Sequence, residues 1–229
     1  MQQIPLAIGP DSAPTFETFI AGANLAALEH LRALPMPAAP VYLWGPSGSG
    51  KSHLLRALVH EVQLAGDRAG CFAAGDALPW NLSPHWTLVV IDDCQMLDAG
   101  AQQAAFTLFV DAATFGVQVL AAGRLPPVDL ALRDDLRTRL AWGHVFAMTC
   151  PSEAESRAAL RREADLRGIL LSDEVMNFCL SHFPRDMKSL MALLDELDKF
   201  ALSRLRPVTV PLLKQMLADR THATVPDRA

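Results

Sequence analysis

The chain has 229 residues, 51% of them hydrophobic, and a formal net charge of −5. This length allows one large domain or two modest ones with a substantial core, and the composition excludes a mainly disordered chain. The negative charge argues against a broad electrostatic surface for nucleic acid, although a local basic patch stays compatible with it.

The cysteine, histidine and hydropathy patterns exclude further classes of protein. The 4 cysteines lie far apart without a C-x-x-C pair, which predicts reduced and mostly buried thiols. The 7 histidines form no zinc-binding spacing. No apolar run reaches membrane-spanning length and no signal peptide opens the chain. We therefore expect a cytoplasmic protein without a membrane partner.

The N-terminal residues carry no periodic pattern of apolar side chains. Proline and glycine interrupt them, so we expect residues 1–12 to form an extended, exposed tail. A helical pattern begins near Asn24, a residue type that commonly caps helices, and continues through leucines as far as Leu34. Closely spaced prolines then end this helix before the next apolar run.

A glycine-rich loop follows the strand expected at residues 41–44 and opens a helical pattern that runs to Leu64. It matches G-x-x-x-x-G-K-[ST], whose glycines let backbone N–H groups wrap a polyphosphate. Lys51 places a positive charge at the outer phosphates, and Ser52 offers a hydroxyl to Mg²⁺. A glycine-rich turn without this function is the alternative, but strand, loop and helix all agree with the motif. The candidate residues for binding a nucleoside diphosphate or triphosphate are Gly45, Pro46, Ser47, Gly48, Ser49, Gly50, Lys51, Ser52 and His53.

A second motif follows about forty residues later, where an apolar run over residues 87–91 ends in two adjacent carboxylates. Such a run is typical of a buried parallel strand that reaches an active-site edge. Asp92 is placed to hold Mg²⁺ through water, and Asp93 to polarise an attacking water. Acidic pairs are also common turn formers, so this motif indicates a nucleotide site only in combination with the phosphate loop.

The remaining elements predict an α/β fold followed by a helical unit. Strands near residues 70–74 and 117–122 and a helix at 101–115 complete the alternation that gives a parallel sheet covered by helices on both faces. From Ser152, a possible capping residue with Glu155, helices are expected at 152–167, 172–181, 184–203 and 211–218. We expect an α/β base at residues 13–150, a small all-helical domain at 151–219 and a loose tail at 220–229.

Taken in order, these motifs resemble the AAA+ ATPase family, in particular the branch of the bacterial replication initiator DnaA and its regulatory inactivator Hda. The opening at residues 15–22 is similar to the F-x-x-F-x-x-G segment of this branch. The resemblance implies that Phe19 lines an adenine pocket, that the cofactor is ADP or ATP with Mg²⁺, and that the helical domain is a lid over the P-loop base.

The resemblance also assigns roles to two arginines. Residues 133–143 are similar to the branch's L-x-S-R-L-x-W-G segment, with Thr138 in place of serine, which implies that Arg139 is an arginine finger reaching a neighbour's nucleotide. Residues 184–190 resemble the sensor 2 helix, which implies that Arg185 touches phosphates from the lid. By themselves, Arg133, Arg137 and Arg139 could balance neighbouring aspartates on a solvated helix face, and Arg185 could be an ordinary helix N-terminal residue.

One departure from the family concerns the strand that ends at residue 122. Arg124 stands where the family has a short polar sensor 1 residue before two prolines. Because a long cation is poorly suited to orient a water beside Asp93, we expect weak or no turnover of the chain's own nucleotide. The nucleotide would then act as a brace between base and lid.

The tail contains Gln3, Ile4 and Leu6, in a peptide that resembles the segment by which bacterial proteins bind the DNA polymerase III sliding clamp. Gln3 would hydrogen-bond at the pocket rim, and Ile4 and Leu6 would be apolar anchors. Ala7 departs from this pattern, and a six-residue peptide can match by chance. The sequence lacks the oligomerisation and helix-turn-helix domains of initiators, so we expect no sequence-specific DNA binding.

Together these features predict a negative regulator of replication initiation. With the DNA-loaded clamp it would promote hydrolysis of DnaA-bound ATP by inserting Arg139 in trans, and it could form a homo-oligomer. Two alternatives stay open. One is an autonomous ATPase that acts as a helicase-loader-like remodeller, and the other is a scaffold whose nucleotide is purely structural.

Overall fold

The computed structural model describes residues 14–184 and 186–223. The chain divides into two compact units, one that ends at Pro151 and one that continues from Ser152. Among the described residues, no helix combines the length and the apolar character that a bilayer-spanning helix requires.

The first unit is built on a five-stranded sheet in which all paired neighbours are parallel. The strand order is β2-β3-β4-β1-β5, so β1 lies between two strands that come much later in the chain. The strands are β1 (Val41–Trp44), β2 (Ala69–Ala73), β3 (Leu88–Asp92), β4 (Gln118–Gly123) and β5 (His144–Ala147).

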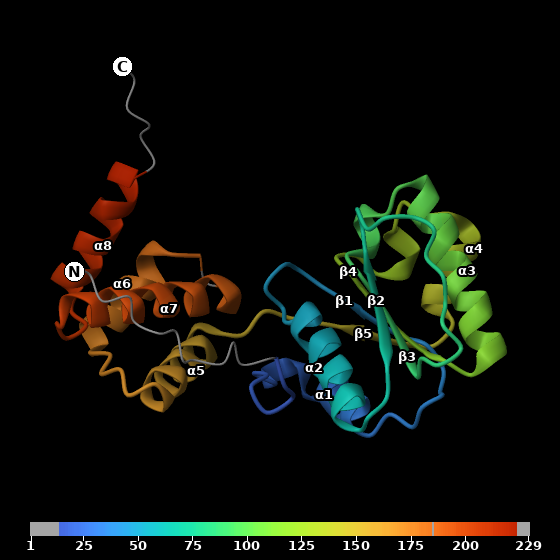
Figure 1. Ribbon diagram of the computed structural model, residues 1–229, viewed down its shortest axis with the longest axis horizontal. Helices are drawn as coiled ribbons and strands as arrows, with labels where there is room; N and C mark the ends of the chain where they lie inside the picture. Colours follow the sequence, from blue (N-terminus) through green and yellow to red (C-terminus); the bar gives the residue numbers. More distant parts are fainter. Residues whose placement is uncertain (1–13, 185, 224–229) are drawn as a thin grey trace, which may run out of the picture. The chain divides into compact units, whose positions relative to one another are not determined.

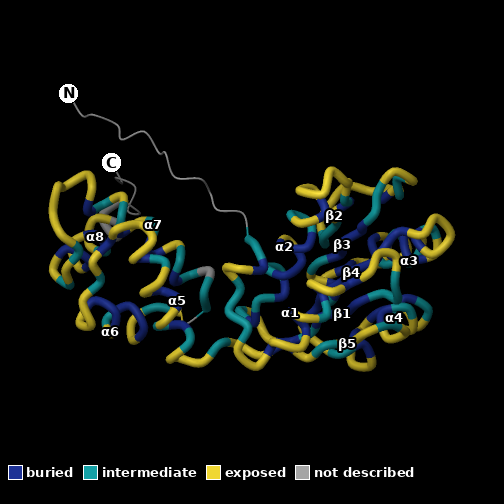
Figure 2. The backbone as a smooth tube through the Cα atoms, turned by 90° about the horizontal axis from the view of Figure 1, so that it is seen from below, coloured by how far each residue is buried: buried dark blue, intermediate teal, exposed yellow. Residues whose placement is uncertain are grey.

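Helices cover both faces of this sheet, as Figure 1 shows. Helices α1 (Leu25–Arg32) and α2 (Lys51–Leu64) pack on one face, while α3 (Ala99–Phe115) and α4 (Asp134–Ala141) pack on the other. Side chains alternate along each strand, so Leu43 joins the core under α2 and its neighbour Tyr42 joins the core under α3. The three central strands β1, β3 and β4 are buried almost throughout, as expected for a sheet covered on both sides (Figure 2).

The described residues of the second unit form four helices around their own core, in which leucine, methionine and valine side chains predominate. The helices are α5 (Glu153–Leu166), α6 (Asp173–His182), α7 (Met187–Arg204) and α8 (Val210–Ala223). The predicted capping box at the start of α5 is present, since Ser152 and Glu155 bond reciprocally to each other's backbone N–H groups.

The predicted fold class, a parallel sheet flanked by helices with a helical unit after it, is confirmed. Three details differ from the prediction. The sequence did not indicate β5, an edge strand whose exposed residues lack apolar alternation. Helix α8 continues to Ala223, beyond the predicted end. Cys94 and Cys179 are buried, but Cys71 and Cys150 are exposed, so the prediction of mostly buried thiols was wrong for two of the four.

Candidate functional site

The candidate site lies at the edge of the sheet where the parallel strands end. The carboxyl ends of β1, β3 and β4 lead into the phosphate loop, the Asp92–Asp93 pair and Arg124, respectively. A backbone hydrogen bond of 3.2 Å from Gly45 N to Gly123 O joins the first of these loops to the third. In open parallel sheets this edge, next to the strand where the order reverses, is the usual place for a ligand.

The phosphate loop requires glycine at its two ends. Gly45 has a φ of +154°, and a Cβ there would lie 2.2 Å from the carbonyl oxygen of Met148. Gly50, the residue before α2, has a left-handed φ of +91°, and a Cβ there would lie 2.5 Å from a ring carbon of Phe19. No side chain in the described part of the chain caps the first turn of α2. The N–H groups of that turn are therefore available to an anion.

Lys51 is the charged group of this loop, and only 7% of the residue is exposed. Its Nζ donates hydrogen bonds of 2.8 Å to the carbonyl oxygens of Gly45 and Pro46, with a longer contact of 3.4 Å to Ser49 Oγ. Burial lowers the pKa of the Lys51 ammonium, and the nearby carboxylates of Asp92 and Asp93 oppose this shift. The two carbonyl oxygens and the Ser49 hydroxyl are neutral acceptors. A negatively charged phosphate oxygen is a stronger acceptor for the ammonium and can replace them.

The N-terminal segment that resembles the family's adenine-binding opening packs against the start of α2. The ring of Phe19 lies 5.6 Å from the ring of His53, between centroids, and also faces Gly50. His53 Nε2 lies 2.8 Å from the carbonyl oxygen of Thr15, which fixes the imidazole against this segment. Burial lowers the pKa of His53, so a neutral ring that donates to this carbonyl is favoured. The structure thus brings together Phe19, His53 and the phosphate loop.

The acidic pair is tied to the next loop through a residue that sequence reasoning missed. Gln95 donates from Nε2 to Asp93 Oδ1 at 3.0 Å and accepts from Arg124 N at 2.9 Å. Asp93 has a left-handed φ of +51°, and its N–H bonds to Asp92 Oδ1 at 2.8 Å. Gln95 therefore fixes the spacing between the carboxylate and the loop that carries Arg124. A glutamine that follows an acidic pair does not by itself predict that its side chain joins the pair to a distant loop.

A buried asparagine fastens the N-terminal segment to the end of the sheet. Asn24 donates from Nδ2 to Thr149 O at 2.9 Å and accepts from Thr149 N at 2.8 Å. The expected role of Asn24 as a helix cap was wrong, because its side chain makes no capping hydrogen bond. The next residue, Cys150, donates from Sγ to Ser47 O at 3.3 Å. The segment after β5 is therefore held both to Asn24 and to the phosphate loop.

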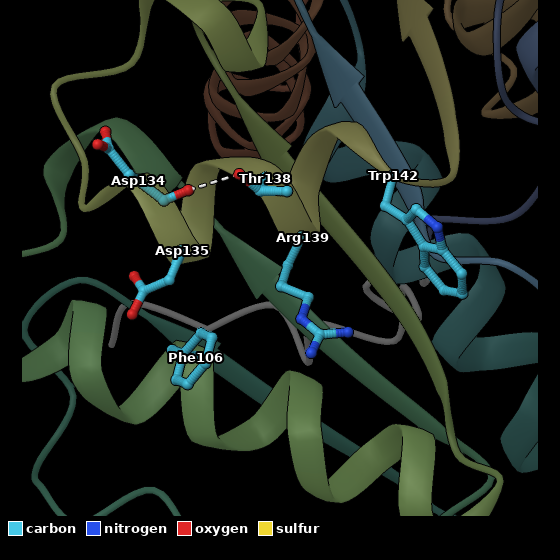
Figure 3. Close-up of a pocket in the computed structure, with 6 residues that line it drawn as sticks. All are labelled: Phe106, Asp134, Asp135, Thr138, Arg139 and Trp142. Carbon is cyan, nitrogen blue, oxygen red and sulfur yellow. Dashed lines mark hydrogen bonds between the residues drawn. The ribbon is translucent and has the colours of Figure 1, made fainter.

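Three arginines lie on or directly before helix α4, and their contacts differ: Arg133 is the N-cap residue, while Arg137 and Arg139 lie on the helix. Arg133 pairs with Asp135 at 2.7 Å, and Arg137 pairs with Asp134 at 2.6 Å. Within the described residues, the guanidinium of Arg139 has neither a hydrogen bond nor an ion pair. It is half-buried and points across a hollow of about 460 Å³ (Figure 3). The residues that line this hollow are Phe106, Asp134, Asp135, Thr138, Arg139 and Trp142.

The residues around the loop fit a nucleotide with Mg²⁺. The glycines of the loop leave no room for larger side chains, and the ammonium of Lys51 lies against the loop carbonyls. In the part of the chain that the structure describes, no side chain caps the first turn of α2. Mg²⁺ in such sites is usually held by one or two protein oxygens together with phosphate oxygens and water. Ser52, on the first turn of α2, and Asp92, at the end of β3, are the oxygen donors of the kind required.

Four predicted site residues lie outside the described part of the chain. They are Gln3, Ile4 and Leu6 of the tail and Arg185 of the helical unit. Their assigned roles stay predictions.

Comparisons with known proteins agree with this arrangement. A sequence model described as "Hda, lid domain" matches residues 153–217. A protein of Haemophilus influenzae that carries no functional name is 32% identical over 231 residues, which cover 94% of this chain and 98% of that protein.

Solved structures resemble the chain over most of its length. Domain III of the replication initiation protein DnaA from Thermotoga maritima superposes with a TM-score of 0.73 at 22% identity, and covers 92% of this chain and 97% of that one. AMPPCP-bound DnaA from Aquifex aeolicus gives 0.69 at 20% identity, over 94% of this chain and 71% of that one. The fold and the site define an AAA+ protein, as the motifs predicted. By its identity over nearly the full length, the chain belongs to the same family as the Haemophilus influenzae protein. Its fold is that of domain III of DnaA, and residues 153–217 match the lid domain of Hda.

Proposed function

We propose that the chain binds ADP or ATP with Mg²⁺ in its base and promotes hydrolysis of ATP bound to DnaA, acting together with the DNA-loaded sliding clamp. The result would be a negative regulator of replication initiation. The observation that carries this proposal is the state of Arg139, which has no partner among the described residues, whereas the neighbouring Arg133 and Arg137 are both paired.

The chemistry of a guanidinium suits this role. It keeps its charge at any physiological pH and presents a rigid fork of N–H donors, which matches the oxygens of a phosphoryl group. Charge spreads over those oxygens as the γ-phosphoryl is transferred, and an arginine supplied by a neighbouring protein accelerates the step by about 10³–10⁵. Arg139 would act in this way on DnaA-bound ATP.

The chain's own nucleotide would have a different fate. When bound, it would supply a polyphosphate for Lys51 and the α2 N-terminus to hold, together with Mg²⁺ at Ser52 and Asp92. Asp93 is the group that could polarise a water, but Gln95 already donates to its carboxylate at 3.0 Å. Arg124 carries a positive charge, and its backbone N–H donates to the same Gln95 side chain. We therefore expect tight binding and slow turnover, with the nucleotide acting as a structural brace.

The decisive experiment is single-turnover hydrolysis of labelled ATP preloaded on DnaA, with the clamp loaded on DNA. Adding the unsubstituted chain should accelerate hydrolysis, and Arg139→Ala should reduce this acceleration by about 10² or more. Arg137→Ala is the matched control. It removes from the same helix a guanidinium whose charge is already neutralised by Asp134. It should retain activity within about twofold, the size expected from an exposed ion pair.

Nucleotide binding by the same variants makes the test specific. Arg139→Ala should bind labelled ADP as well as the unsubstituted chain does. If it accelerates hydrolysis undiminished, the role of Arg139 is refuted. Strong ATPase activity of the chain alone, stimulated by single-stranded DNA, would support a helicase-loader-like remodeller instead.

Contact with the clamp needs a separate experiment. Deletion of residues 1–8 should abolish capture of the chain by immobilised clamp while ADP binding persists, because Gln3, Ile4 and Leu6 are the proposed anchors. Unchanged capture would show that the chain contacts the clamp through other residues.

A further inference from the structure

The spacing of charges on α4 makes the free state of Arg139 unexpected. Asp135 precedes Arg139 by four residues, which places the two side chains on the same face, one turn apart. An acidic residue four positions before a basic one is the favourable arrangement for an ion pair on a helix. Both residues also line the same hollow (Figure 3). Nevertheless Asp135 does not pair with Arg139.

Asp135 is instead occupied by two other donors. Its Oδ2 accepts from a terminal nitrogen of Arg133 at 2.7 Å, and its Oδ1 accepts from the backbone N–H of Leu136 at 2.7 Å. The second acid of the helix, Asp134, is occupied by Arg137. Each carboxylate near the start of α4 therefore already has an arginine partner.

Arg133 is held in place by helix α3. Its backbone N–H donates to Gln102 Oε1 at 3.0 Å, and its guanidinium also donates to Gln103 Oε1. The guanidinium carbon lies 5.8 Å from the ring centroid of Phe106, within range of a cation–π contact. Because α3 already restricts this side chain, pairing it with Asp135 costs little further conformational entropy. Arg139 has no such restraint among the described residues and would lose more freedom by pairing.

We propose that Arg133 is a positioning residue that keeps Asp135 occupied and thereby keeps Arg139 available for the partner's phosphates. This inference rests on the proposed function of Arg139. In the absence of Arg133, Asp135 would capture Arg139 within the helix, and the partner's nucleotide would have to compete with that pair.

The test compares four variants in the assay with ATP-loaded DnaA and the clamp. Arg133→Gln should lower the acceleration by about two- to fivefold, since the new pair is an exposed one on a helix surface. The double variant Arg133→Gln with Asp135→Asn should recover the activity, because no carboxylate is left to capture Arg139. Asp135→Asn alone should stay active, and Arg139→Ala should be inactive.

These outcomes separate the inference from the function on which it rests. If Arg139→Ala is inactive and Arg133→Gln is fully active, only the positioning role is wrong. If Arg133→Gln is impaired and Asp135→Asn does not rescue it, Arg133 acts through the fold and the proposal is overturned. If Arg139→Ala is active, the proposed function fails, and a second readout then decides the positioning role.

That readout is the NMR signal of the Arg139 side chain in the isolated chain, assigned by its loss in Arg139→Ala. The guanidinium should rotate freely in the unsubstituted protein, become restricted in Arg133→Gln, and regain its freedom in the double variant. The restriction should weaken as salt is raised to about 0.5 M, because exposed pairs are screened. An Arg139 signal that does not change in Arg133→Gln would overturn the proposal without reference to any partner.

Discussion

Replacing Asn24 by alanine should destabilise the base unit, because the hydrogen bonds of the Asn24 side chain are lost. Only 4% of Asn24 is exposed, and its amide makes two hydrogen bonds, of 2.9 and 2.8 Å, with the backbone of Thr149. A neutral hydrogen bond contributes about 1 kcal/mol net, and a buried backbone group left without a partner costs somewhat more. We therefore expect the free energy of unfolding to fall by about 2–3 kcal/mol.

Urea denaturation followed by tryptophan fluorescence measures this effect in the right unit. The four tryptophans, Trp44, Trp80, Trp86 and Trp142, all precede Pro151, so the signal reports on the base. A loss of this size also corresponds to a melting temperature lower by roughly 5–10 °C in a domain of this length.

Two further variants sharpen the test. Asn24→Asp keeps an acceptor for the N–H of Thr149 but places a carboxylate oxygen against the carbonyl oxygen of Thr149. The repulsion between these two oxygens raises the pKa of the introduced carboxyl group. Its stability should therefore improve as the pH falls through that raised value, since the folded state then binds the extra proton. Glu17→Ala, which removes an exposed pair with Arg32, should cost less than about 0.5 kcal/mol. The reasoning is refuted if Asn24→Ala costs no more than Glu17→Ala.

The remaining predictions concern the phosphate loop and His30, a partly buried histidine of α1. ADP at about 100 times its dissociation constant should stabilise the chain by about 2.7 kcal/mol in a thermal-shift assay, and Lys51→Ala should abolish this gain. Gly50→Ala should lower the melting temperature more than Gly66→Ala; both positions have a left-handed φ, but a Cβ at Gly50 meets the Phe19 ring at 2.5 Å and one at Gly66 meets nothing within 4 Å. Burial, aided by a neighbouring histidine, lowers the pKa of His30, so urea midpoints should fall as the pH drops below about 6.5, and His30→Phe should flatten this dependence.

The sequence was sufficient for those parts of the site that depend on local spacing. The phosphate loop and the Asp92–Asp93 pair are each defined by neighbours along the chain, and both lie where a strand ends, as predicted. The core strands were recognisable for the same reason, because burial on both faces demands an unbroken apolar run. β5 was not predicted because an edge strand with exposed side chains does not need an unbroken apolar run.

Links between distant residues could not be predicted in this way. The contact of Asn24 with Thr149 spans 125 positions, and that of Arg124 with Gln95 spans 29. Asparagine and glutamine occur in caps, turns and surfaces alike, so their identity does not indicate a partner. Without the family resemblance, Arg133, Arg137 and Arg139 could not be told apart for the same reason. Their charges are visible in the sequence, whereas the contacts of Arg133 with α3 decide which carboxylate each arginine meets.

Two cations of the base differ in what they gain from a phosphate. Lys51 is buried and bonded to carbonyl oxygens, so a bound nucleotide exchanges one set of acceptors for a stronger one, and the gain goes into binding. Arg139 is half-buried with no acceptor among the described residues, so its gain arises only when a partner brings phosphate oxygens to it. Binding energy that appears only with the developing charge accelerates a reaction, whereas energy realised with the resting ligand does not. Under the proposed function, Lys51 therefore holds a nucleotide and Arg139 acts on another protein's nucleotide.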